Sequence, residues 1–448
     1  MTQEFDLIVL GAGSAGLTVA QRAARYGARV ALFDPGAVGG TCVNRGCVPK
    51  KALWFAAQLA QAQSLAVDYG FALTPGRLDW AQFRRLRDRY IEAIRQRYDV
   101  RLDEAHVQRV HQAGRFVAAD TVQAESGERY RAPQIVIATG ARPRERGLPG
   151  FTLGMVSDDV FELPELPRRI GVVGGGYIAA EFACLLHALG CEVELLIRGR
   201  LLDSFDAELT QALATQMLAR GIRITRGADI GGARGEPGAL LLDDTGGGVH
   251  GPFDAVLWAT GRVPNSDRLG LVEIGVACDA KGFVQTDAFQ NTSVAGITAL
   301  GDVTAHPQLT PVAVSAGYAL IERLFGGQPE ACFDYRVIPT VVFAEPPLGM
   351  IGLTEAQARG QYGDAVRVYS RRFTPLQFAV AGHDTPTVMK LVCTGDDEQV
   401  LGMHVLGPGA DEMLQGFAVA MRQGLYRRDL RSAVAIHPTS AEELLLLH

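Results

Sequence analysis

The feature that most constrains the fold is an approximate internal repeat. The segments FDLIVLGAGSAG (5–16) and RRIGVVGGGYIAAE (168–181) share one layout. In each copy a short apolar strand leads into a glycine-rich turn and an amphipathic helical run, and a second strand follows at 28–34 or 191–198. A strand, a helix and a second strand in that order make a βαβ unit. The sequence therefore predicts two Rossmann-like α/β units in one chain.

Two further matching pieces follow the two copies. QIVIATGARPR (134–144) corresponds to AVLWATGRVPN (255–265), and both are buried-strand patterns that end in Ala-Thr-Gly and then a proline. We expect the first piece to lead the chain out of the first unit into the second. The second piece is expected to lead it back, because ITALGDVT (297–304) has the pattern of another strand.

The pattern changes from about residue 334. Runs at 338–353, 366–379, 388–394 and 400–407 have the composition of strands in an antiparallel sheet, and helical segments follow, including one at 411–425. Together these predict a third, α+β domain. A chain of 448 residues has the length of about three domains.

Composition excludes several classes of function. The net charge is −6, and 21% of the residues are charged, so we expect neither nucleic acid nor an anionic membrane as a partner. The apolar N-terminal stretch is preceded by Glu4 and Asp6 without a cation, which argues against a signal peptide. Most of the seven cysteines are isolated, unlike a secreted disulfide framework. We therefore expect a cytoplasmic protein, in which a disulfide would be catalytic.

The first glycine turn has the pattern of a dinucleotide site. Gly11, Gly13 and Gly16 form G-x-G-x-x-G after a strand, where they allow a tight turn, approach to a pyrophosphate and helix packing. The helix N-terminus favours the phosphate. Asp34 ends the second strand, where an acid can bind ribose hydroxyls. The alternative is an ordinary glycine turn.

The second copy has Gly174, Gly176 and Ala179, and its second strand ends in Arg198, with Arg200 two positions later. An arginine there would pair with a 2′-phosphate, whereas an acid would repel it. The second site is therefore expected to prefer NADPH to NADH. A pair of solvated arginines is the alternative.

Two nucleotide sites in one chain indicate an electron relay between a flavin and a nicotinamide. We expect FAD in the first site, because a segment with two cysteines follows it directly and a flavin passes electrons to sulfur. The predicted FAD-binding domain has two parts, 1–144 and 262–333. The predicted NADPH-binding domain is 145–261, and the third, α+β domain is 334–448.

The segment GGTCVNRGCVPKK places Cys42 and Cys47 five positions apart. On an ideal helix their Cα atoms would be roughly 8.6 Å apart, beyond the ~7 Å limit for a disulfide. Bridging them needs a distorted turn, which Gly46 and Pro49 favour. We interpret the pair as redox-active, because a distorted, accessible bridge is easily reduced. Inert thiols and a metal site remain as alternatives, although no suitably spaced Cys/His cluster follows.

Charged side chains are expected around this pair. Lys50 and Lys51 would favour a thiolate, and Lys50 could also pair with Glu181 near the nicotinamide. Near the end of the chain, His437 precedes Glu442 at the start of a predicted helix. A histidine oriented by a carboxylate can carry protons to and from a thiol. Taken alone, such a histidine is more often a satisfied polar residue.

With these segments the chain resembles the pyridine nucleotide–disulfide oxidoreductases, and the glutathione reductases most closely. The resemblance covers nearly all of the chain, and its most specific segments are GGTCVNRGCVPKK, GGGYIAAEFA, LGDVT with LTPVA, IPTVVFAEPP, DEMLQGFAVA and VAIHPTSAEE.

The resemblance implies a homodimer in which 334–448 is the interface, or dimerisation, domain. In it NADPH reduces FAD, FAD reduces the Cys42–Cys47 disulfide, and the resulting dithiol reduces a bound disulfide. Cys42 would attack the substrate, and Cys47 would lie against the flavin. His437 and Glu442 would come from the partner subunit, and Tyr177 would gate the nicotinamide pocket. The FAD contacts implied are Gly11, Gly13, Ser14, Gly16, Asp34, Thr41, Thr139, Gly140, Asp302 and Thr310. Those for NADPH are Gly174, Gly176, Ala179, Arg198, Arg200 and Gly261.

The substrate pocket departs from that of glutathione reductases. Gln21 and Tyr318 stand where arginines for the substrate carboxylates are usual, while Tyr98 matches a pocket tyrosine. Asp203 stands near the place of the second NADPH arginine. We therefore expect glutathione disulfide or a related, less anionic small disulfide as the substrate. Alternatives are a flavin reductase of this fold acting on a quinone, a metal or a protein disulfide, and a non-enzymatic redox-sensing flavoprotein.

Overall fold

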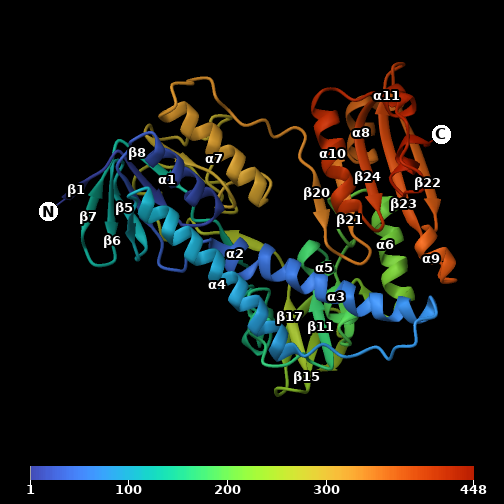
Figure 1. Cartoon of the computed structure of the whole chain (residues 1–448). Helices are drawn as coiled ribbons and strands as arrows, with labels where there is room; N and C mark the ends of the chain where they lie inside the picture. Colours follow the sequence, from blue (N-terminus) through green and yellow to red (C-terminus); the bar gives the residue numbers. More distant parts are fainter. Residues whose placement is uncertain (1, 448) are drawn as a thin grey trace. The chain divides into compact units, whose positions relative to one another are not determined.

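The structure is a computed structural model in which residues 2–447 are described (Figure 1). By its internal contacts the chain divides into two compact units. Unit 1 comprises 1–52, 82–144 and 261–335, and unit 2 comprises 53–81, 145–260 and 336–448. Within residues 2–447, none of the helices combines the length and the apolar character that a membrane span requires.

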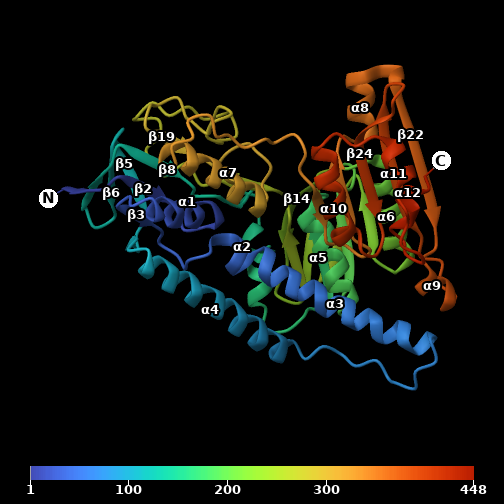
Figure 2. The same ribbon diagram turned by 45° about the horizontal axis from the view of Figure 1, so that its top comes forward.

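Unit 1 is built on a five-stranded parallel sheet. Its order is β19 (Ile297–Ala299), β8 (Gln134–Ile137), β2 (Leu7–Leu10), β3 (Val30–Phe33) and β4 (Gln108–Val110). Helices α1 (Ser14–Arg25) and α7 (Thr310–Leu324) pack against each other, and Figure 2 shows them side by side. The first βαβ unit is thus confirmed, and so is the predicted strand within 297–304.

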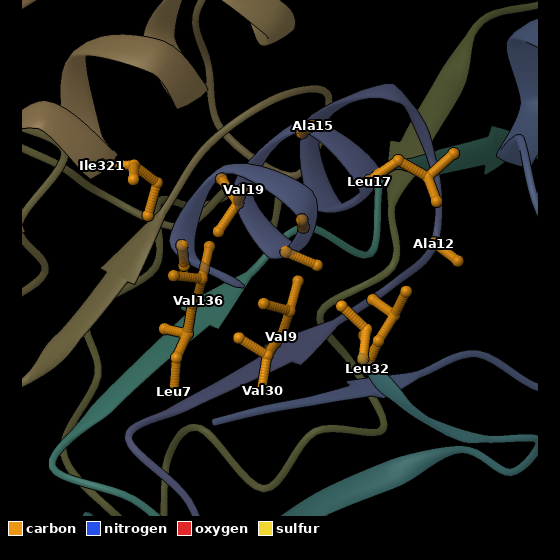
Figure 3. Close-up of a cluster of buried hydrophobic side chains, with 14 of the residues drawn as sticks. Leu7, Val9, Ala12, Ala15, Leu17, Val19, Val30, Leu32, Val136 and Ile321 are labelled. Carbon is orange, nitrogen blue, oxygen red and sulfur yellow. The ribbon is translucent and has the colours of Figure 1, made fainter. Parts of the chain in front are cut away.

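Alternation along the strands creates two cores in unit 1. Leu7 and Val9 of β2 face the helix layer, where α1 and α7 contribute Val19 and Ile321 (Figure 3). Ile8 faces the other side, because successive side chains of a strand alternate. That side is covered by a second sheet with the order β1 (Thr2–Glu4), β7 (Arg129–Arg131), β6 (Thr121–Ala124) and β5 (Gly114–Ala118). The glycine turn after β2 is thereby held at the carboxyl end of a rigid sheet.

Three helices lie between β3 and β4 in the sequence: α2 (Gly40–Arg45), α3 (Cys47–Asp68) and α4 (Trp80–Glu104). A short antiparallel pair, β9 (Ala141–Pro143) with β18 (Arg262–Pro264), joins the two matching Ala-Thr-Gly pieces. The chain passes from unit 1 to unit 2 after Arg144 and returns at Gly261. The two pieces thus carry the chain out and back, as the sequence predicts.

Unit 2 contains the second copy of the repeat as a parallel sheet. Its order is β10 (Met155–Val156), β17 (Ala255–Trp258), β11 (Arg169–Val173), β12 (Glu192–Ile197) and β13 (Arg223–Arg226). The helices are α5 (Tyr177–Ala188), α6 (Ala207–Ala219) and two 3-10 turns, Phe151–Leu153 and Asp159–Glu162. An antiparallel sheet follows with β14 (Ile230–Arg234), β15 (Leu240–Asp244) and β16 (Val249–Phe253).

The C-terminal part of unit 2 is the predicted antiparallel sheet. Its order is β20 (Thr340–Val342), β21 (Leu348–Gly352), β24 (Gln399–Leu406), β23 (Thr387–Thr394) and β22 (Val366–Phe373). The helices are α8 (Glu355–Tyr362), α9 (Leu376–Val380), α10 (Ala410–Arg422), α11 (Arg427–Ser432) and α12 (Glu442–Leu445), with a 3-10 turn at Gly363–Ala365. The division of 145–261 and 334–448 into separate domains stays a prediction.

One strand prediction is too long. The sequence predicts a strand throughout 366–379, whereas β22 ends at Phe373 and α9 begins at Leu376. Pro375 lies between them and precedes the first residue of the helix. A proline has no backbone N–H for a ladder hydrogen bond, which explains why the strand stops there.

Candidate redox-active site

The cysteine segment has the predicted distorted turn. Helix α2 ends at Arg45, Gly46 has a non-helical backbone (φ −140°, ψ −113°), and α3 begins at Cys47. A Cβ atom on Gly46 would lie 2.9 Å from the carbonyl oxygen of Thr41, closer than side-chain carbons pack. The two helices can therefore meet at this angle only with a glycine between them, and the two cysteines are set on either side of the turn.

Cys42 and Cys47 are both free thiols in the structure. The Sγ of Cys47 lies 3.7 Å from Thr310 Oγ1. A hydrogen bond from the Cys42 thiol lowers the pKa of Cys47 to about 6; the Thr310 hydroxyl and the positive charge of Lys50 also lower it, while burial opposes them. The same hydrogen bond, together with burial, raises the pKa of Cys42. At neutral pH the pair is therefore one thiolate, Cys47, and one thiol, Cys42.

The ends of two helices frame these sulfurs. Ser14 is the first residue of α1, and Thr310 is the first residue of α7. The hydroxyl groups of both residues act on Cys42 and lower its pKa, although less than the opposing effects raise it. Helix N-termini also favour nearby negative charge. The site thus combines hydroxyl groups and helix N-termini around the cysteine pair.

The first glycine turn fits a dinucleotide. Gly11 has φ +106°, and a Cβ there would overlap the carbonyl oxygen of Ala138. The space beside Gly13 is open, because a Cβ would meet only the Cα of Gly40, at 3.9 Å. Asp34 accepts hydrogen bonds from the backbone N–H groups of Ala12 (2.6 Å) and Gly36 (2.7 Å). Asp34 thus orders the turn, and its contact with a ribose stays a prediction.

Other residues predicted to bind the flavin lie on the same unit. Thr139 follows β8, and its hydroxyl donates to the carbonyl oxygen of Asn265 at 2.7 Å. Gly140 is next and accepts from the N–H of Asn265 at 2.9 Å. Asp302 follows β19, and burial raises its pKa. Thr41 lies in α2, one position before Cys42. Such backbone groups, hydroxyls and a partly buried carboxyl suit a ligand with a pyrophosphate and a polyol.

The second glycine turn is also shaped for a dinucleotide. Gly174 has φ +138°, and a Cβ there would overlap the carbonyl oxygen of Ala259, whereas nothing lies within 4 Å of a Cβ on Gly176. Ala179 is fully buried in α5. Tyr177, the first residue of α5, is 46% exposed. An open turn with an exposed aromatic ring beside it can accept a nucleotide, and the gating role of Tyr177 stays a prediction.

Glu181 is buried in α5 and accepts a hydrogen bond from the backbone N–H of Phe343 at 2.8 Å. Lys50 belongs to unit 1 and Glu181 to unit 2, so the predicted pair between them stays a prediction. Gly261, predicted to contact NADPH, is the residue at which the chain returns to unit 1, and its carbonyl accepts from the N–H of Arg144 at 2.9 Å.

Both arginines predicted to bind a 2′-phosphate already have acidic neighbours. Arg198 Nη1 lies 4.0 Å from Asp229 Oδ1, and Arg200 Nε lies 3.0 Å from Asp203 Oδ1. By the resemblance to glutathione reductases, Asp203 stands near the place of the second NADPH arginine. The second nucleotide site thus has two exposed guanidinium groups whose charge is partly balanced.

His437 and Glu442 form the predicted pair. His437 Nδ1 lies 3.0 Å from Glu442 Oε2, and Glu442 Oε1 accepts from the backbone N–H of Thr439 at 3.2 Å. The hydrogen bond with His437 holds the pKa of Glu442 below its usual value. The His437 side chain is 78% exposed, whereas that of Glu442 is 14% exposed. The carboxylate therefore orients an exposed imidazole, and its catalytic role stays a prediction.

The predicted substrate residues Gln21 and Tyr318 lie on α1 and α7. Between these helices, Glu322 accepts from Arg22 Nε at 2.8 Å and from the Tyr26 hydroxyl at 2.8 and 2.9 Å. The Arg22 guanidinium also lies 4.8 Å from the centre of the Tyr318 ring. The sequence reasoning missed Glu322. The spacing of four residues from Tyr318 to Glu322, and from Arg22 to Tyr26, is the signal that could have found this cluster.

Tyr98, the third predicted substrate residue, lies in α4 and packs partly buried against the core of the α1–α7 layer. Gln21 Nε2 is buried and has no hydrogen-bond partner among residues 2–447. In the same range, no group of three or more His, Cys, Asp or Glu side chains is placed to hold a metal ion. The cysteine pair is therefore not part of a larger metal-ligating cluster in the described chain.

Comparison with known proteins agrees with this geometry. Residues 5–317 match a family model described as "pyridine nucleotide-disulphide oxidoreductase". Residues 338–447 match the dimerisation domain of the same family. The chain is also 38% identical, over 466 residues, to a glutathione reductase of Yarrowia lipolytica; this similarity covers 99% of the chain and 98% of that protein.

Proposed function

Because the chain belongs to the pyridine nucleotide–disulfide oxidoreductases, we propose that it uses NADPH and FAD to reduce a small disulfide at Cys42 and Cys47. The enzyme is an oxidoreductase with a flavin and a pyridine nucleotide as cofactors. The observation that carries the proposal is the thiol–thiolate pair, with the Cys47 thiolate beside the Thr310 hydroxyl. A bound flavin supplies the route by which a hydride from the nicotinamide reduces a disulfide.

In the proposed reaction Cys42 attacks the substrate, and Cys47 then resolves the mixed disulfide. The Cys42 thiol loses its proton to a base, and its sulfur attacks one sulfur of the substrate, whose other half leaves as a thiolate and takes up a proton. The Cys47 thiolate attacks Cys42 in the resulting mixed disulfide. The Cys42–Cys47 bond forms as the bond from Cys42 to the substrate half breaks, and that half leaves as a thiolate and takes up a proton from solvent. This half-reaction therefore converts one disulfide into two thiols and leaves the pair oxidised, ready to be reduced again through the flavin.

The base in this proposal is His437 of the partner subunit. The dimerisation domain at 338–447 supports a homodimer, and the exposed imidazole held by Glu442 is suited to reach a second copy. Glu442 would hold a proton on His437 Nδ1, the nitrogen that it contacts. His437 Nε2 would then be left to accept the proton of the Cys42 thiol. In a monomer the Cys42 thiol would have no such base.

The substrate is proposed to be glutathione disulfide or a less anionic relative of it. Gln21 and Tyr318 provide no charge for a substrate carboxylate, and Arg22, the cation next to Gln21, is bound by Glu322. Two missing charge-assisted hydrogen bonds would each weaken binding of a carboxylate by roughly 1.5–3 kcal/mol if buried. A disulfide with fewer carboxylates loses less in this pocket.

Steady-state oxidation of NADPH with a panel of disulfides tests the proposal. The panel contains glutathione disulfide, its amidated forms, cystine and hydroxyethyl disulfide. We expect activity that is abolished in Cys42→Ser and is highest for a substrate with fewer carboxylates than glutathione disulfide. A quinone reduced equally well by the Cys42→Ser variant, with no disulfide reduced by the wild type, would contradict the proposed reaction. An ordinary KM for glutathione disulfide and no better substrate would contradict the substrate class.

A further inference from the structure

The carboxyl ends of β12 and β13 bring a third arginine to the second nucleotide site. The two strands are parallel neighbours, and Ile197 is the register partner of Arg226. Arg226, the last residue of β13, therefore lies one position from the level of Arg198. The carboxyl end of the second strand of a Rossmann unit is where the ribose 2′ position of a dinucleotide is recognised. The sequence alone did not single out Arg226.

The direction of its side chain follows from its neighbours along the strand. Thr225 and Arg223 both bind Glu194, at 3.0 and 3.2 Å, so odd positions of β13 point to that side of the sheet. Arg226 points to the opposite side, because strand side chains alternate. There it lines a cavity of about 140 Å³ together with Arg200, Leu201, Ala207, Thr210 and Gln211.

The three arginines differ in their partners. Arg198 and Arg200 have Asp229 and Asp203 as acidic neighbours, at 4.0 and 3.0 Å. Arg226 is exposed, and its side chain makes no hydrogen bond or ion pair with any residue from 2 to 447. An arginine without a carboxylate partner, which shares a cavity with a second arginine, retains its full charge and donors for an anion.

We propose that Arg226 binds the 2′-phosphate of NADPH and replaces the cation that is missing at Asp203. This inference rests on the proposed use of NADPH. Arg226 would approach the phosphate from the end of β13 and Arg200 from the segment after β12. Thr210 and Gln211 offer further polar groups at the same cavity. Selectivity for the phosphorylated cofactor is thus set by β13 as well as by the segment after β12.

Calorimetric titration of the flavin-loaded enzyme tests this without turnover. The ligands are 2′,5′-ADP, which carries the 2′-phosphate, and 5′-ADP, which lacks it. We expect Arg226→Met to weaken binding of 2′,5′-ADP roughly 10- to 100-fold, the range of a charge-assisted hydrogen bond, and to leave 5′-ADP binding within about two-fold. Arg226→Lys should restore part of the lost affinity, because lysine keeps the positive charge but lacks the planar set of N–H donors of arginine.

Arg372→Met is the matched control. Arg372 is an exposed strand arginine of unit 2, outside the cavity, and its loss should change neither affinity. Unchanged binding of 2′,5′-ADP in Arg226→Met, or an equal loss for both ligands, would overturn the role of Arg226 while leaving the proposed NADPH preference intact. If the wild type itself does not prefer 2′,5′-ADP, both proposals fail. Should Arg226→Met not fold, Arg226→Gln gives the same comparison.

Discussion

Arg22 and Glu322 form an ion pair that joins α1 to α7, with Arg22 Nε donating to Glu322 Oε1 at 2.8 Å. Hydrogen bonds from Tyr26 and Arg22 hold the pKa of Glu322 below its usual value. The side chains are 31% and 15% exposed, so the pair is only partly screened by water. The positive charge of Arg22, the cation next to Gln21, is therefore balanced by a carboxylate of the protein itself.

The first prediction follows from that pair. Glu322→Gln should leave the Arg22 charge unbalanced and make it available to a substrate carboxylate. We expect kcat/KM for glutathione disulfide to rise about 3- to 10-fold, which is less than a fully buried charged hydrogen bond would give, because the pair is partly exposed. Steady-state NADPH oxidation at low salt measures this.

Two comparisons make the result specific. Hydroxyethyl disulfide carries no charge, so its kcat/KM should not change. Glu330→Gln removes a carboxylate from an exposed position of the same unit, and it should leave both substrates unaffected. A rise that is equal for the charged and the neutral disulfide would show that Arg22 does not act through charge.

The second prediction concerns the cysteine pair. The Cys42 thiol is the main group that lowers the pKa of Cys47, so Cys42→Ala should raise this pKa above about 6. The rate of alkylation of Cys47 by iodoacetamide, followed by peptide mass spectrometry in the reduced protein, should then have its midpoint at higher pH. Cys278, whose own pKa is raised by burial, serves as the internal control. An unshifted Cys47 midpoint in Cys42→Ala would contradict the shared hydrogen bond.

The third prediction tests whether His437 acts across a dimer. Cys42→Ser and His437→Ala should each lack disulfide reductase activity. A mixed dimer of the two variants contains one complete site, formed by Cys42 of one subunit and His437 of the other. Random co-assembly should therefore restore about a quarter of the wild-type activity, since half of the dimers have one of two sites intact. Absence of any recovery, with mixed dimers shown by differential tags, would place His437 outside the partner's site.

Local sequence predicted the parts of this structure that depend on near neighbours. The glycine turns, the interruption of the helix at Gly46 and the start of α12 at Glu442 are set by residues within a few positions, so their patterns are visible in the chain. The pairing of His437 with Glu442 spans five positions and was predictable for the same reason.

Contacts between distant elements were not predictable in this way. Arg22 and Glu322 are 300 positions apart, and Arg226 shares a cavity with Arg200 only because β13 pairs with β12. A single sequence shows which helix face or strand end carries a charge, but not which other element packs against it. The departures at Gln21 and Tyr318 were visible in the sequence. The pairing of Arg22 with Glu322, in contrast, depends on the packing of α1 against α7.

The last prediction uses Asp203, which lies 3.0 Å from Arg200 and partly balances its charge. Asp203→Asn should strengthen binding of 2′,5′-ADP by about 3- to 10-fold, because it removes a negative charge near the phosphate and leaves Arg200 free to donate. Binding of 5′-ADP should not change. The matched control is Asp364→Asn, because Asp364 is exposed and distant from Asp203 in the sequence. Asp206→Asn would not serve as a control, because Asp206 binds the buried Lys390 at 2.9 Å. Calorimetry at two salt concentrations should show the gain shrinking as salt increases, and a gain independent of salt would argue against an electrostatic role for Asp203.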